Sequence, residues 1–97
     1  MFKRFPPNRY EKGETVLDAY ILINAKPGKV WKIAEDLLKV PKIDVAHVVT
    51  GQYDIIAHVK FEDMDALKKV LSRVQNIGGI TRTQTAVSMV TKSKEPV

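Results

Sequence analysis

Hydrophobic and polar positions along this chain of 97 residues follow two alternating periods, and together they predict six elements. Apolar residues alternate with a period of two, or run continuously, in four stretches that we expect to be strands. Between the strands they recur every three to four residues, which indicates helices. The expected strands are 16–25, 42–50, 53–62 and 80–90, and the expected helices are 27–40 and about 63–76.

Turn and cap residues fix the ends of the two expected helices. Pro27 suits the first turn of a helix, because its missing N–H is not needed there. The residue before Pro41 disfavours helical backbone, so the first helix should end there. The second helix has capping residues at both ends. They are Asp63 or Asp65 at its start, and Asn76 with Gly78-Gly79 at its end.

The element order β-α-β-β-α-β predicts an α+β, ferredoxin-like fold. One antiparallel sheet would carry both helices on one face, with the first and third strands in its centre. The length suits a single domain. We place this domain at residues 16–91, after a flexible basic arm (1–15, with Pro6-Pro7 and Gly13) and before a tail (92–97).

The central strands are apolar on both faces, which a half-exposed sheet does not require. The first strand offers Ile21 and Ile23 to one face, and Tyr20 and Leu22 to the other. The third strand adds Ile56 to the second face. Each large apolar side chain left in water forgoes about 1.5–3 kcal/mol of burial. We therefore predict that the open face packs on a second copy, as a two-fold dimer or dimeric α+β barrel.

Composition narrows the class of protein. The chain has no cysteine, which excludes disulfides and thiolate metal sites and suits a cytoplasmic protein. No apolar run approaches the ~20 residues of a membrane span, and the N-terminus does not have the pattern of a secretory signal. The formal charge of +5 is concentrated in residues 1–12 and 26–42. A nucleic-acid-binding module that uses the basic arm and the first helix is therefore one alternative.

The stretch "VTGQYD", residues 49–54, is the first candidate site. Gly51-Gln52 fits a two-residue type II′ hairpin, with glycine at the first central position. This turn accounts for Gly51 but not for Asp54, since Asp is rare in strands unless it is solvated or partnered. A carboxylate beside exposed turn amides suits a ligand with both charges. Asp54 would take its ammonium and the amides its carboxylate.

The two histidines lie on the strands that flank this turn. If Gly51 and Gln52 form the loop, His47 faces Ile56 and His58 faces Val45, so the histidines are diagonal neighbours. No third metal ligand is evident, and we expect no metal or other cofactor. A small enzyme that uses His47 or His58 as a base is the second alternative, but neither has a catalytic partner at a suitable spacing.

The last strand and the first helix hold further candidates. Thr81, Thr83 and Thr85 share one face of the strand, while Arg82 and Gln84 face the other way. Threonine hydroxyls can bind a small polar ligand. Trp31 on the first helix is an expected packing residue or interface anchor.

Three segments, "AYILINAKPGKVWKIAEDL", "VVTGQYDIIAHVKFEDMDALKKVL" and "GGITRTQTAVSMV", resemble the effector-binding RAM domain of Lrp/AsnC transcription regulators. The most specific parts are the T-G-x-Y-D turn and the T-x-T strand. The resemblance covers residues 18–90. About 15 residues precede it, too few for the helix-turn-helix of full-length members. The chain thus resembles a stand-alone RAM protein, and the DNA-binding activity of that motif does not carry over.

This resemblance implies a function and an assembly. It implies a non-enzymatic amino-acid sensor built of dimers that assemble into octamers or decamers, which acts on transcription or on an enzyme by pairing with full-length regulators. The effector would bind between dimers, near the glycine turn. The residues carried over by position are Thr50, Gly51, Tyr53, Asp54, Thr81 and Thr83. The sequence does not name the amino acid.

Overall fold

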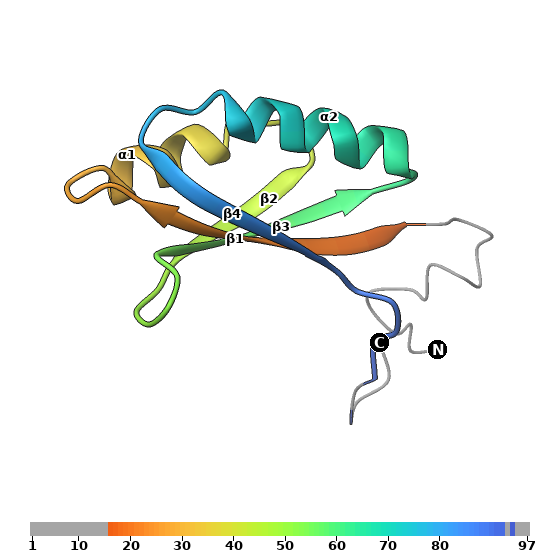
Figure 1. Cartoon of the computed structure of the whole chain (residues 1–97). Helices are drawn as coiled ribbons and strands as arrows, with labels where there is room; N and C mark the ends of the chain where they lie inside the picture. The colour runs from red at the N-terminus through yellow and green to blue at the C-terminus, as the bar shows by residue number, and fades with distance from the viewer. Residues whose placement is uncertain (1–15, 93, 95–97) are drawn as a thin grey trace, which may run out of the picture.

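The computed structural model describes residues 16–92 and 94, which form one sheet and two helices (Figure 1). The expected arm at 1–15 lies outside the described residues. The elements confirm the β-α-β-β-α-β order. They are β1 (Leu17–Ala25), α1 (Val30–Leu37), β2 (Ile43–Val48), β3 (Ile55–Phe61), α2 (Met64–Gln75) and β4 (Ile80–Val87).

The four strands form an antiparallel sheet in the order β2-β3-β1-β4, so the first and third strands are central, as predicted. Both helices lie on one face of the sheet (Figure 1). The pairing of β2 with β3 sets His47 opposite Ile56 and Val45 opposite His58. The register predicted from the sequence is therefore confirmed.

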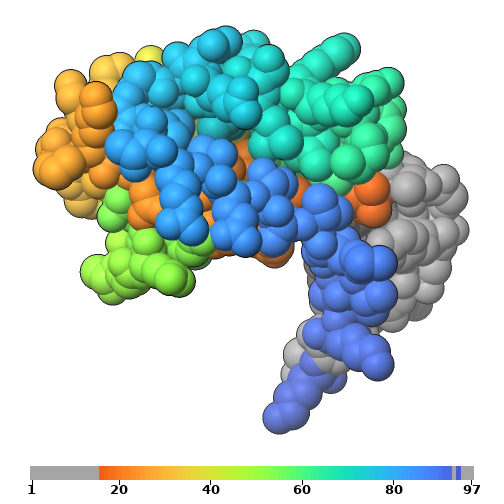
Figure 2. Space-filling view, in the orientation of Figure 1, coloured from red at the N-terminus to blue at the C-terminus, as the bar shows by residue number. Residues whose placement is uncertain are grey.

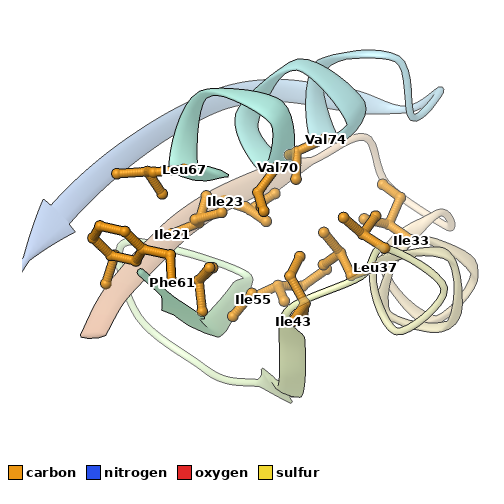
Figure 3. Close-up of a cluster of buried hydrophobic side chains, with 14 residues drawn as sticks. Ile21, Ile23, Ile33, Leu37, Ile43, Ile55, Phe61, Leu67, Val70 and Val74 are labelled. Carbon is orange, nitrogen blue, oxygen red and sulfur yellow. The ribbon is translucent and has the colours of Figure 1, made fainter. Parts of the chain in front are cut away.

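The hydrophobic core lies between the helices and the covered face of the sheet. Figure 3 shows core side chains of α1, α2, β1, β2 and β3 meeting in this layer. Ile21 and Ile23 of β1 are fully buried there. The core also takes Leu67, Val70 and Val74 from one side of α2, as their spacing of three to four residues requires.

The first helix is shorter than predicted. It begins at Val30 instead of Pro27. Lys29 donates its backbone N–H to the Lys26 carbonyl at 3.0 Å, which closes a turn around Pro27 and Gly28. Gly28 has φ +82, and proline followed by a left-handed glycine is the pattern of a type II turn. The prediction that Pro27 lies in the first turn of the helix is therefore wrong, because Pro27 belongs to the tight turn that precedes the helix.

The second helix begins as predicted. Asp63 is its N-cap, and the side-chain oxygen of Asp63 accepts a hydrogen bond from the backbone N–H of Ala66 at 2.8 Å. Asn76 follows the last turn as the C-cap. Gly79, at φ +96, then lets the chain turn back toward the sheet.

The open face of the sheet carries the apolar residues that the sequence placed there. The strand register sets Tyr20 beside His58 and Leu22 beside Ile56, and Tyr20 is 42% exposed. In Figure 2 the β2–β3 hairpin (green) and the segment after β4 (blue) project below the sheet, with a recess between them. None of the helices in the described residues is long and apolar enough to cross a membrane.

Candidate functional site

The hairpin that joins β2 to β3 is wider than the predicted two-residue turn. The strands end at Val48 and begin again at Ile55, so residues 49–54 form a six-residue loop. Val49 donates its N–H to the Asp54 carbonyl at 2.9 Å and closes the base of this loop. Gly51 has φ +124, a left-handed backbone that favours glycine. The loop projects from the sheet on the side away from the helices (Figure 1).

Asp54 anchors the loop to β1. Its backbone N–H donates to the Ile23 carbonyl at 2.9 Å. Its side-chain Oδ2 accepts a hydrogen bond from the backbone N–H of Ala25 at 2.8 Å. The last β1–β3 pair is Ile23 with Ile55, so the Ala25 N–H lies just past the end of that ladder. The carboxylate of Asp54 thus satisfies a backbone donor that β3 no longer serves, which gives this residue a structural role in addition to any role in binding.

Side chains from β1 and β4 also contact residues of the loop. The Tyr53 hydroxyl forms a hydrogen bond with Gln84 Oε1. The Arg82 guanidinium lies over the Tyr53 ring, 5.8 Å from its centroid. Asn24 donates its side-chain N–H to the Gln52 carbonyl at 2.9 Å. Fixing Tyr53 and Gln52 in this way pre-organises the loop before any ligand arrives.

The sequence did not single out Asn24, Arg82 or Gln84 as site residues. Each becomes part of the site because β4 pairs with β1 at the end of the sheet where the loop projects. In the register, Asn24 is opposite Arg82 and Leu22 is opposite Gln84. The sequence did hold a signal for these residues. The predicted strand order makes the first and last strands neighbours, and all three polar side chains lie near the same end of that pair.

Four of the six backbone N–H groups of the loop have no acceptor in the described part of the chain and can bind a ligand. Among the described residues, the N–H groups of Thr50, Gly51, Gln52 and Tyr53 donate to no protein acceptor. The first three of these residues are exposed. Four consecutive amides beside a carboxylate can bind an anionic group and a cationic group of one small molecule.

The threonines of β4 do not join the loop within one chain. Thr83 is opposite Ile23, whose side chain points into the core on the helix-covered face. The loop projects from the other side. Thr81 has no partner on β1, because the register passes from Arg82 to Ile80 at the irregularity. Both threonines are exposed, so a site that includes them and the loop would need a second subunit.

His58 is a partnered residue of the open face. Its Nδ1 lies 2.7 Å from the Asp44 carboxylate and its Nε2 lies 2.9 Å from the Asp18 carboxylate. The ring centroids of Tyr20 and His58 are 5.1 Å apart. The described part of the chain holds no group of three or more His, Asp or Glu residues placed to bind a metal ion. His58 therefore ties three strands together with both ring nitrogens engaged.

Trp31 does not pack into the described part of the chain, since the residue is 74% exposed. Of the two roles expected for it, intramolecular packing is wrong. The role as an interface anchor stays a prediction. It would concern the outer surface of α1, away from the hairpin loop.

The protein-family model of the Lrp/AsnC ligand binding domain matches residues 18–97 of this chain. The chain belongs to the Lrp/AsnC family. An uncharacterised helix-turn-helix transcriptional regulator of Pyrococcus abyssi is 36% identical over 81 residues, which cover 82% of this chain and 51% of the regulator. The Lrp/AsnC chain described here thus spans about half the length of that relative.

Solved structures share this fold. The TTHA0845 protein of Thermus thermophilus superposes with a TM-score of 0.76 at 25% identity, over 80% of this chain and 99% of its own. A Neisseria meningitidis transcriptional regulator, solved as a complex with L-Met, superposes with a TM-score of 0.72 at 20% identity. That match covers 99% of this chain and 63% of the regulator, and it supports the fold of the Lrp/AsnC domain.

Proposed function

We propose that this Lrp/AsnC domain is an amino-acid-binding regulatory module whose ligand site is built on residues 49–54. The observation that carries the proposal is the Asp54 carboxylate beside the amides of Thr50 to Tyr53, which have no acceptor within residues 16–92 and 94. An α-amino acid presents an ammonium and a carboxylate on one carbon. The two halves of the loop complement these two charges.

Asp54 can keep its structural bond while it binds a ligand. Oδ2 accepts from Ala25, whereas Oδ1 has no donor among the described residues. A carboxylate accepts several hydrogen bonds at once. The ligand ammonium would therefore bind Oδ1, and the loop amides around Gly51 would bind the ligand carboxylate. The complex of the Neisseria meningitidis regulator with L-Met supports an amino acid as the class of ligand.

We propose further that the site is completed by oligomerisation. The open face would pack on a second copy, because Tyr20, Leu22 and Ile56 lie on it outside the core. Dimers would then assemble into a larger ring, an octamer or a decamer. In that ring Thr81 and Thr83 of a neighbouring subunit would reach the loop, which the fold of one chain does not allow.

The proposed partners of this module are full-length regulators of the same family. The relatives are transcriptional regulators by name, and this chain matches about half of the first of them. Mixed assembly through the shared ligand-binding domain would let an amino acid that binds here change the regulator's activity. Co-elution of the two chains from a sizing column, and its dependence on the amino acid, would test this role.

Isothermal titration calorimetry against the twenty amino acids tests ligand binding, and light scattering with and without each ligand tests assembly. We expect at least one amino acid to bind and the mass to exceed that of a dimer. An Asp54→Asn variant should lose about tenfold or more in affinity, since a hydrogen bond to a charged group contributes about 1.5–3 kcal/mol. Failure of all twenty to bind would refute the sensing function.

A further inference from the structure

We propose that the loop site selects amino acids with a second carboxylate, and that Arg82 is the residue that selects them. The inference rests on the proposed function, because it names the class of ligand for the same site. The positive charge of Arg82 has no part in the binding of the ligand ammonium and α-carboxylate. An α-amino acid is satisfied by Asp54 and the loop amides, yet a guanidinium also faces this loop.

Arg82 lies at the loop without a charged partner among residues 16–92 and 94. Its guanidinium lies 5.8 Å from the centre of the Tyr53 ring, and the Tyr53 hydroxyl is itself fixed by Gln84. Among the described residues, no carboxylate pairs with Arg82. The side chain is therefore oriented by an aromatic face, while its N–H donors stay available.

The position of Arg82 matches the geometry of the loop. Arg82 is opposite Asn24 in the sheet, and Asn24 holds the Gln52 carbonyl. The next residue of β1, Ala25, donates to Asp54. Arg82 and Asp54 thus flank one short loop, with a positive group over Tyr53 and a negative group beside it. A ligand bound between them would have its side chain within reach of a guanidinium.

The side chain of the ligand should be one that a guanidinium binds well. A guanidinium binds carboxylates in a bidentate manner, with two parallel charge-assisted hydrogen bonds. If the ligand had a neutral side chain, the guanidinium of Arg82 would not form this bidentate pair and its N–H donors would bond to water. Three binding groups, namely the carboxylate, the row of amides and the guanidinium, are matched by one ammonium and two carboxylates. L-glutamate and L-aspartate have this set of charges.

The magnitude of the expected selectivity follows from exposure. Arg82 is exposed, which weakens an ion pair, whereas its fixed orientation over Tyr53 lowers the entropic cost of binding. We expect the protein to bind L-glutamate about tenfold more tightly than L-glutamine, which has the same shape without the charge.

Calorimetry of the full chain with L-glutamate, L-aspartate, L-glutamine and 2-oxoglutarate tests the proposal. In the Arg82→Gln variant the preference for glutamate over glutamine should fall to about one, and a wild-type circular-dichroism spectrum would show that the variant is folded. Arg82→Lys, which keeps the charge but not the bidentate geometry, should give an intermediate ratio. Arg73→Gln, an exposed arginine of α2, is the matched control and should leave the ratio unchanged. 2-Oxoglutarate, which lacks the ammonium, should bind more weakly than glutamate.

The outcomes separate this inference from the proposed function. Equal binding of glutamate and glutamine by the wild-type chain, or a preference that survives in Arg82→Gln, overturns the selectivity and leaves amino-acid binding in place. Loss of both ligands in a folded Arg82→Gln protein would mean that Arg82 binds the α-carboxylate, which also overturns it. Binding of no amino acid by the wild type refutes the proposed function and this inference together.

Discussion

The side-chain Oδ2 of Asp54 and the backbone N–H of Ala25 form a 2.8 Å hydrogen bond across 29 residues of sequence. The Ala25 N–H points to the β3 side of β1, just past the last β1–β3 pair, which is Ile23 with Ile55. The Asp54 side chain therefore accepts a bond that a continued ladder would give to a backbone carbonyl. One carboxylate therefore supports the sheet with one oxygen and offers the other to the loop. Structure and binding at this position can be separated by experiment.

Two substitutions of Asp54 should separate them. Asp54→Asn keeps an oxygen for Ala25 and removes the charge, so we expect a stability loss of about 1 kcal/mol or less. Asp54→Ala removes the acceptor as well and should cost about 1–3 kcal/mol. Urea unfolding measures both values. Equal stability losses in the two variants would contradict the structural role of the Asp54–Ala25 bond.

Two glycines should respond differently to alanine. At Gly51 (φ +124) an added Cβ meets no atom within 4 Å. Only backbone strain then remains, and we expect Gly51→Ala to cost about 1 kcal/mol. At Gly79 (φ +96) the Cβ would come within 3.1 Å of Ile33 Cδ1 and 3.2 Å of Lys29 Cβ. Gly79→Ala should therefore cost more, by about 1 kcal/mol. A thermal melt of each variant measures the difference, and the reverse order would be inconsistent with these contacts.

A charge on the open face should prevent dimerisation without unfolding the chain. Leu22 lies on this face opposite Ile56 and Gln84, so Leu22→Glu would bury an unpaired carboxylate only in the dimer. We expect sedimentation equilibrium to show a folded monomer. Met64→Glu, an exposed position on α2, is the control and should keep the wild-type mass. A wild-type-sized assembly of Leu22→Glu would argue against the proposed interface.

The ion pairs of α1 should give a small pH dependence of stability. The Lys32 ammonium, 3.0 Å away, hydrogen-bonds to Asp36 and holds the pKa of that carboxyl below its usual 3.8. Because the folded-state pKa is the lower one, this stabilisation is complete above the usual value. It is lost as pH falls through the folded-state pKa. Asp36→Asn should thus be less stable than wild type at neutral pH, and the gap should narrow in acid well below pH 3.8. Urea unfolding at both pH values checks this, with Glu35→Gln as the control.

Much of the fold was determined by the sequence. Apolar periodicity predicts the order of elements and, through it, the central position of β1 and β3. The register that pairs His47 with Ile56 follows once an even number of residues is placed in the hairpin. Periodicity is a local property that burial enforces, since a one-residue slip would turn a buried strand face to water. The Asp63 cap was readable for the same reason, because it satisfies N–H groups only a few residues away.

Element ends and the contacts of the site were decided only by the tertiary structure. Local patterns assigned Pro27 to the helix and two residues to the hairpin. A turn around Gly28, and bonds from Asp54 to Ile23 and Ala25, shortened the helix and widened the loop. Asp54 was recognised as unexplained by its turn, yet its partner lies 29 residues away. Arg82 and Gln84 meet Tyr53 only because β4 folds back beside β1. Such contacts depend on which strands become neighbours, and no local pattern of hydrophobic and polar residues specifies them.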